Sequence, residues 1–273
     1  MGIDPIEYTT WNGKRTKLLH RTALIANKIF NKSLRSKGVL ALLIIGSVLV
    51  HAFPILLTAF APYEKLDTDI IRPYMRDGLF ALFSILLAAV VTSDIISADY
   101  HDNSFILYFS RPIKPLVYMF SKLLGALSVL GLFCLLMPVT FGITVMGTQT
   151  GSDYTTSFKM LGLTVVAGIF TTFFFVAMGV MFSSLTKRKA YAGVGTFIGF
   201  FAPMTLGEFF AYFDPNWRLL SPVNILHFTY DLIYGFDLPT EISSNYYYLA
   251  LTAYLAFPLI VSYVTLQKKA VGK

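Results

Sequence analysis

The sequence has few charged side chains and almost no cysteine. Asp, Glu, Lys and Arg make up only 14% of its 273 residues, whereas a typical soluble domain has about 25%. Such a chain has too little polar surface to cover a core, which excludes an ordinary water-soluble globule, a disordered chain and a basic nucleic-acid-binding module. The single cysteine, Cys134, excludes an intramolecular disulfide framework and a cysteine-based metal site.

The sequence also lacks the motifs of membrane-embedded and nucleotide-dependent enzymes. Neither H-E-x-x-H nor G-x-S-x-G occurs, and no two of the four histidines are spaced as a metal pair on a helix. The Gly-Lys pairs at 13–14 and 272–273 are not followed by Ser or Thr, as a phosphate-binding loop requires. We therefore expect no catalytic residue, metal or cofactor on this chain, and any ATP hydrolysis must come from another chain.

What the sequence does contain is long apolar runs. A helix rises 1.5 Å per residue, so about 20 apolar residues cross the hydrocarbon of a bilayer. The continuous runs are too long for strands, and we predict an all-α, polytopic membrane protein. Its transmembrane domain covers 39–266, and the six predicted spans are 39–61, 79–96, 123–146, 160–185, 190–213 and 247–266.

The distribution of basic residues predicts the orientation. Of the 22 Lys and Arg residues, 17 lie in the segments 1–38, 97–122, 186–189 and 267–273. Cytoplasmic loops carry such an excess of Lys and Arg. We therefore predict a multi-pass protein of the plasma membrane with both termini in the cytoplasm and the segment 214–246 outside.

The N-terminal segment 1–38 has an amphipathic pattern. An apolar face and a basic face are typical of a helix lying in the cytoplasmic interface among anionic headgroups. The alternative is a basic linker that only sets topology. On a helix, the apolar face holds Leu19, Ala23, Ala26, Ile29, Phe30 and Leu34, and the opposite face holds Arg21, Lys28, Asn31, Lys32 and Arg35.

The cytoplasmic connection 97–115 is unusual in having a polar half, 99–104, followed by five consecutive apolar residues, 105–109. A plain loop does not need such a run, whereas a short element half-buried against the bilayer or a partner protein does. Pro112 and Pro115 then end this element and turn the chain into the third span.

This segment resembles the hallmark of the ABC transporter type-2 permease family. In that family an acidic residue is followed four positions later by Gly-Thr, then by an apolar run, a proline turn and a lysine in the next helix. Here Asp99 takes the place of a longer Glu, and Asn103 and Ser104 take the places of Gly and Thr. Asn is the residue after Gly that best tolerates a left-handed backbone. The turn corresponds to Arg111, Pro112 and Ile113, and the lysine corresponds to Lys122.

The resemblance implies a fold, partners and site residues. Two six-span units, either two copies of this chain or the chain and a homologue, pair around a pathway. Two cytoplasmic ABC ATPase subunits, which hold ATP and Mg²⁺, bind beneath them. The N-terminal amphipathic helix corresponds to the interfacial elbow helix of the family. The residues expected to meet the ATPase are Asp99, His101, Asp102, Asn103 and Ser104.

A second cytoplasmic contact is expected at the turn formed by Lys187, Arg188 and Lys189, although these residues could equally serve only topology. The implied function is that of a permease subunit, an exporter rather than an importer, coupled to ATP hydrolysis on a separate subunit. The main alternative is a polytopic membrane scaffold or assembly factor without an ATPase partner. A six-span intramembrane enzyme is a further alternative, which the missing site chemistry disfavours.

Few residues within the spans suggest a pathway. His51 and Glu208 are ionisable residues in spans. Each could contact substrate, or His51 could be a hydrogen-bonded packing residue and Glu208 an interface residue that reaches water. Pro138 and Pro203 should kink the third and fifth spans. The Phe residues at 173–175, 200–201 and 209–210 could line an apolar pathway or face lipid.

The segment 214–246 is predicted to contain a short helix. Ser221 and Pro222 form an N-cap and a first helical position, and Gly235 can end the helix. We expect a re-entrant or interfacial helix that shapes an outer gate, or one that only covers the bundle.

Overall fold

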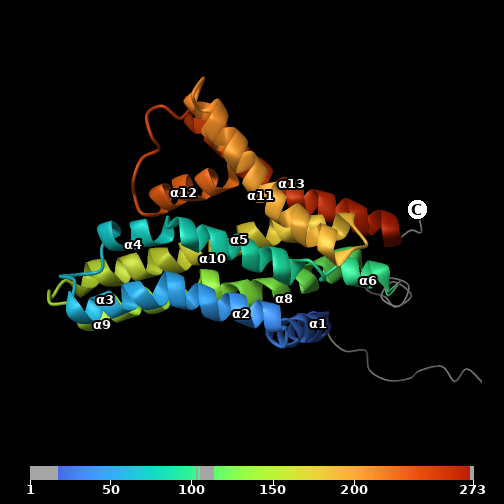
Figure 1. Ribbon diagram of the computed structural model, residues 1–273, viewed down its shortest axis with the longest axis horizontal. Coiled ribbons are helices and arrows are strands. Elements are labelled where there is room, and N and C mark those ends of the chain that lie inside the picture. The colour runs from blue at the N-terminus through green and yellow to red at the C-terminus, as the bar shows by residue number, and fades with distance from the viewer. Residues whose placement is uncertain (1–17, 103, 105–113, 271–273) are drawn as a thin grey trace, which may run out of the picture.

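The structure is a computed structural model that describes residues 18–102, 104 and 114–270 (Figure 1). These residues form helices and connections, with no strand among them, which confirms the all-α prediction. Asn103, Arg111, Pro112 and Ile113 and the apolar run 105–109 lie outside the described residues. The helices are α1 (Leu18–Leu34), α2 (Lys37–Gly46), η1 (Ser47–Ala52), α3 (Phe53–Phe60), α4 (Thr68–Met75), α5 (Gly78–Thr92), α6 (Ser97–His101), α8 (Pro115–Cys134), α9 (Leu136–Thr148), α10 (Tyr154–Leu185), α11 (Lys189–Phe210), η2 (Pro215–Leu220), α12 (Pro222–Ile233) and α13 (Ser244–Ala270).

Six helical stretches are long and apolar enough to span a membrane, as predicted. The third begins at Pro115, two turns before the apolar run at 123, because proline is well placed at the first position of a helix. The six stretches are Lys37–Phe60, Gly78–His101, Pro115–Thr148, Tyr154–Leu185, Lys189–Phe210 and Ser244–Lys269.

The third span is broken where α8 meets α9. Leu135 joins the two helices with φ −111° and ψ −57°, three residues before the buried Pro138. Because proline has no N–H, it cannot donate to the carbonyl of Cys134, which accounts for a break at this point. Gly168 of α10 lies against the break, and a Cβ there would be 2.9 Å from the Leu135 Cα. In contrast, Pro203 lies within the continuous helix α11.

The helical bundle has two distinct ends. Figure 1 places α1, α6 and the end of α13 at one end, and the α3–α4 and α9–α10 connections at the other. We call the first of these the α6 end. Lys187, in the turn between α10 and α11, also lies there, since its Nζ is 4.6 Å from the centre of the Tyr100 ring in α6. The basic segments predicted to share one side of the membrane therefore share one end of the bundle.

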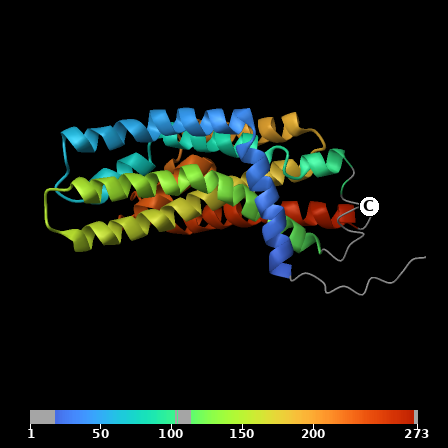
Figure 2. The ribbon, with the colours of Figure 1, turned by 90° about the horizontal axis from the view of Figure 1, so that it is seen from below.

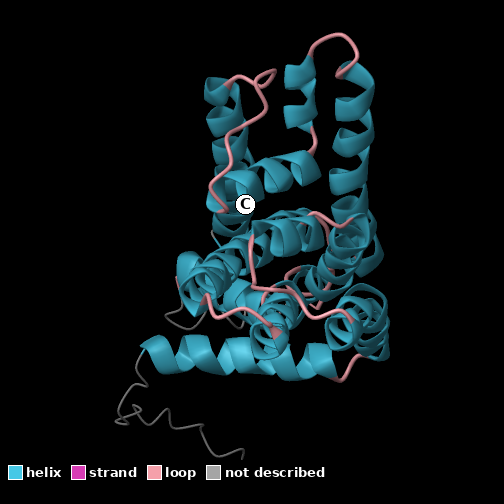
Figure 3. Ribbon diagram, turned by 90° about the vertical axis from the view of Figure 1, so that its left-hand side faces the viewer, coloured by secondary structure: helices cyan, strands magenta, loops and turns pink. Residues whose placement is uncertain are grey.

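The first helix crosses the bundle at the α6 end. Figures 2 and 3 show α1 lying across the long axis that most of the other helices follow. Its Ile29 is buried against Gly125 of α8, where a Cβ would lie 2.7 Å from the Ile29 Cβ. Leu19, on the predicted apolar face of α1, is 82% exposed in the isolated chain. An amphipathic helix is therefore present where predicted, and its placement in the membrane interface stays a prediction.

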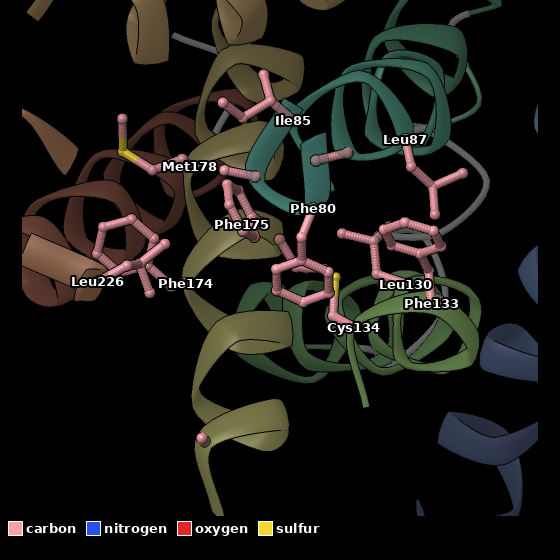
Figure 4. Packing of buried hydrophobic residues seen from close by; sticks show 14 of the residues in the cluster. Phe80, Ile85, Leu87, Leu130, Phe133, Cys134, Phe174, Phe175, Met178 and Leu226 are labelled. Carbon is pink, nitrogen blue, oxygen red and sulfur yellow. The ribbon is translucent and has the colours of Figure 1, made fainter. Parts of the chain in front are cut away.

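The core lies between α5, α8 and α10 (Figure 4). Phe174 and Phe175 of α10 are buried and both pack against Phe200 of α11, with a ring-centre distance of 5.1 Å between Phe175 and Phe200. These three aromatic residues therefore fill the interior of the chain itself. Phe209, in contrast, is 59% exposed.

The segment after α11 contains α12, which begins and ends at the predicted residues. The Ser221 Oγ accepts from the N–H of Asn224 at 3.2 Å, and Gly235 has φ +88° just after the helix. Buried Asp231 ties α12 to α4, because it accepts from Arg72 Nε at 2.7 Å and from Arg76 Nη1 at 2.9 Å. This end of α12 is thus held by an ion-pair cluster.

Candidate functional site

The short helix α6 begins at a point fixed by α10. The Ser183 Oγ accepts from the backbone N–H of Ile96 at 3.0 Å and from that of Ser97 at 3.1 Å. The first N–H groups of a helix have no partner within it, so this hydroxyl satisfies donors that would otherwise be orphaned. One turn earlier on α10, Gly179 lies directly against Thr92 at the end of α5 and leaves no room for a side chain. Small residues of α10 therefore allow the close approach that positions α6.

The side of α6 that faces the protein is anchored by Asp99. Its Oδ2 accepts from the Tyr118 hydroxyl at 2.5 Å and lies 2.6 Å from the Nζ of Lys122. The Lys122 side chain is only 8% exposed and that of Asp99 18% exposed. A charge pair shielded from water in this way costs about 3–5 kcal/mol to break by removing one partner. The acidic residue and the lysine of the sequence motif are thus direct partners.

Tyr100 connects α6 to two further parts of the chain. The Nζ of Lys269, near the end of α13, lies 3.5 Å from the Tyr100 ring centre, and Lys187 approaches the same ring. Lys269 Nζ also donates to the carbonyl of Ser184 at 2.7 Å, in the last turn of α10, where a cation is favoured by the helix dipole. The predicted contact segment at 99–104 and the predicted contact turn at 187–189 are therefore neighbours.

The opposite side of α6 is open to solvent. The side chains of His101 and Asp102 are 73% and 67% exposed, and their Nδ1 and Oδ1 atoms lie 3.0 Å apart. Ser104 continues the chain, with its N–H donating to the Asp99 carbonyl at 2.9 Å. Lys187, Arg188 and Lys189 are also exposed. We call these exposed residues the α6 face: His101, Asp102, Lys187, Arg188 and Lys189.

A comparison with known protein families identifies the family of this chain. The family described as ABC-2 family transporter protein matches residues 23–271, which run from α1 to α13. The chain belongs to the ABC-2 transporter family. This ABC-2 protein is accordingly a multi-pass membrane component of an ABC transporter, as the resemblance in the sequence implies. A search of curated proteins found no match to the chain.

Three residues of this site were not predicted. Tyr118 lies one helical turn before Lys122, and helical neighbours at that spacing share a face, so its contact with Asp99 could have been inferred. Ser183 and Lys269 reach α6 from distant parts of the chain. Neither has a local sequence signal, because only the tertiary packing brings them there.

The four residues predicted for a pathway have separate environments in this ABC-2 protein. His51 is buried in the π-helical segment η1, where its Nδ1 is hydrogen-bonded to the Tyr74 hydroxyl. Its Nε2 has no partner among the described residues. Glu208 is exposed and accepts from Asn224 Nδ2 at 2.6 Å. Pro138 breaks the third span, and Pro203 lies within α11. Their part in a pathway stays a prediction.

No metal site is found in the part of the ABC-2 protein that the structure describes. The ranges 18–102 and 114–270, with Ser104, hold no group of three or more His, Cys, Asp or Glu residues that could bind a metal ion.

Proposed function

We propose that this ABC-2 permease moves a substrate out across the plasma membrane, using ATP hydrolysis on separate subunits. Two permeases, identical or homologous, would form the pathway. Two ABC ATPases, which bind ATP and Mg²⁺, would dock at the α6 end, with both permease termini in the cytoplasm. Export is the direction that the family resemblance favours.

This proposal rests on the fact that α6 has one side anchored to the bundle and one exposed side. Its inner side is bound to α8 through Asp99 and to α13 through Tyr100, and Ser183 of α10 binds its start, while His101 and Asp102 face outward. A partner that displaces α6 would therefore displace the spans that hold it. A ligand-driven shift requires different contacts in the two states, and a nucleotide-driven closure of the ATPase beneath the α6 face would supply them.

The charge of the α6 end supports the same orientation. Lys187, Arg188 and Lys189 lie there together with the basic N-terminal helix and Lys269. Such clusters are retained on the cytoplasmic side of membranes, where ATP is available. The α6 face also carries both signs of charge, which allows a complementary partner to be selected by electrostatic fit.

Purification of the tagged permease from native membranes tests the proposal. We expect an ABC ATPase to copurify in a complex that hydrolyses ATP and is inhibited by vanadate. Reversing charge on the α6 face with H101E and D102K together should abolish copurification while leaving membrane insertion intact. The control is K159E, a charge reversal at an exposed residue near the start of α10, at the opposite end.

Undiminished copurification of the H101E/D102K protein would contradict the role of the α6 face. A purified permease that transports substrate with no ATPase attached would contradict the proposal as a whole. If no ATPase is recovered and no transport occurs, the result favours a membrane scaffold or assembly factor.

A further inference from the structure

A cavity of about 150 Å³ lies at the α6 end, apart from α6 itself. It is enclosed by the end of α1, the start of α2, the end of α5 and the start of α11. Most of its lining is polar, which is unusual in a chain with so few charged residues. The polar lining residues are Lys32, Ser33, Ser36, Asp94 and Lys189.

The cavity is lined by a hydroxyl that has no partner within the chain's described residues. Ser33 is only 8% exposed and lines the cavity, and its side chain makes no hydrogen bond to a described residue. Its oxygen is not among the fully enclosed polar atoms of the described residues that lack a partner, so it is accessible from the cavity. The hydroxyl is therefore placed to bond a group that enters the cavity.

The start of α2 adds backbone donors to the same cavity. The helix begins at Lys37, and its N-cap residue Ser36 forms no side-chain cap. The first N–H groups of a helix have no acceptor within it, and the aligned peptide dipoles make this end positive. Ser36 and Val39 line the cavity, so the uncapped first turn borders it. Helix N-termini of this kind bind phosphate groups.

The charged side chains leave the cavity with one excess positive charge. Lys32 Nζ lies 2.8 Å from the Asp94 carboxylate, and Lys189 Nζ lies 3.9 Å from it. Asp94 would repel an anion, but the two lysines outnumber it, and both lysine side chains are more than half exposed. Among the residues that line the cavity, Asp94 is the one acid.

Val39, Val90 and Val91 form the apolar part of the lining. Val39 and Val91 are only 2% and 1% exposed, so the chain itself already buries them, whereas Val90 on α5 is partly exposed. Val90 lies one turn further into its span than Asp94 does. An amphiphile matches this order, because it carries its phosphate at one end and its acyl chains at the other.

We propose that this cavity binds the phosphate headgroup of an anionic phospholipid of the leaflet at the α6 end. The uncapped start of α2, the Ser33 hydroxyl and Lys32 hold the phosphate, and Val90 contacts the glycerol and the upper acyl chain. Bound lipid then joins α1 and α2 to α5 and α11. The site requires no ATPase, so it can be tested on the permease alone.

Thermal unfolding of the purified full-length permease in detergent tests the site. The titrated probes are dioleoyl phosphatidylglycerol, dioleoyl phosphatidylcholine and inorganic phosphate. Phosphatidylglycerol at about 100-fold over its Kd should raise Tm by about 5 °C, and the other two probes should raise it much less. Ser33→Ala and Lys32→Gln should each raise the apparent Kd for phosphatidylglycerol about tenfold, because each variant loses one hydrogen bond to a charged group. The control variant Lys28→Gln removes the same charge from an exposed position one turn away and should leave the Kd unchanged.

Three results would overturn the proposal. Equal losses of phosphatidylglycerol affinity in Lys28→Gln and Lys32→Gln would mean that the lipid is attracted to the basic helix in general and does not bind a specific site. Equal stabilisation by phosphatidylcholine would exclude recognition of the anionic headgroup. Stabilisation by inorganic phosphate without any by phosphatidylglycerol would assign the cavity to a free ion. If Lys32→Gln fails to fold, Ser33→Ala, which keeps the ion pair with Asp94, decides the question.

Discussion

Asp99 of α6 and Lys122 of α8 form an ion pair of 2.6 Å that joins the end of the second span to the start of the third. The pair is largely shielded from water, and the Tyr118 hydroxyl completes it on the same carboxylate oxygen. The residues that define the family motif therefore bind each other within one chain. In this permease Asp99 holds α6 in place, and the neighbouring His101 and Asp102 are exposed.

Removing one charge of this pair should destabilise the protein. Asp99→Asn removes the carboxylate that pairs with the buried Lys122, at a cost of about 3 kcal/mol, or a Tm lowered by roughly 5–10 °C. Thermal unfolding in detergent measures the change. The double variant Asp99→Asn/Lys122→Met should recover part of the loss, because no uncompensated charge remains. The control variant Asp102→Asn changes an exposed residue and should alter the free energy of unfolding by less than about 0.5 kcal/mol. Equal effects of Asp99→Asn and Asp102→Asn would contradict the anchoring role.

Two glycines of α10 should respond to alanine in opposite directions. A Cβ at Gly168 would lie 2.9 Å from the Leu135 Cα and 3.0 Å from the Cys134 carbonyl, so Gly168→Ala should push α10 away from the break and cost about 2 kcal/mol. A Cβ at Gly162 meets nothing within 4 Å, so Gly162→Ala should stabilise the helix by about 0.5–1 kcal/mol. The same unfolding assay measures both. A stabilising Gly168→Ala would show that α10 does not need this close approach.

Stability should fall in mild acid through His227 of α12. Burial, and to a smaller extent the charge of Arg76, lower its pKa from 6.5 to about 4, while Asp231 opposes the change. The unfolded chain therefore binds the proton at higher pH than the folded chain does. This contribution to stability is complete above about pH 6.5, is lost as the pH falls below that value, and levels off near pH 4. Measuring Tm from pH 8 to 4 should show a shallower decline for His227→Gln. Identical profiles of Tm against pH for the wild-type protein and His227→Gln would exclude His227 as the cause of the decline.

Cysteine labelling should reveal the orientation, because the one natural cysteine, Cys134, is fully buried and can be replaced by Ser. On that background, a cysteine at exposed position 237, after α12, should react with a membrane-impermeant maleimide on intact cells. A cysteine at exposed position 102, at the α6 end, should react only after permeabilisation. The reverse pattern would contradict cytoplasmic termini.

The spans could be predicted from the sequence because backbone groups in lipid must be satisfied within each helix, which requires long apolar runs. The cap at Ser221, the end of α12 at Gly235 and the break near Pro138 followed from local chemistry in the same way. The cluster around Tyr100 could not be predicted, because Lys187 comes from the α10–α11 turn and Lys269 from α13, and only tertiary packing brings them together. For the same reason, the sequence did not show that Phe174 and Phe175 face Phe200 rather than lipid.

The ion-pair cluster at the other end of the molecule limits how that end can open. Asp231 of α12 receives one hydrogen bond from Arg72, and both of its oxygens accept from Arg76. Arg72 also stacks on Phe236, with its guanidinium carbon 4.2 Å from the ring centre. Any passage formed between α4 and α12 would break these hydrogen bonds and leave a buried carboxylate without its counter-ions, at a cost of about 3–5 kcal/mol. Opening at this end therefore costs less along routes that move α4 and α12 together.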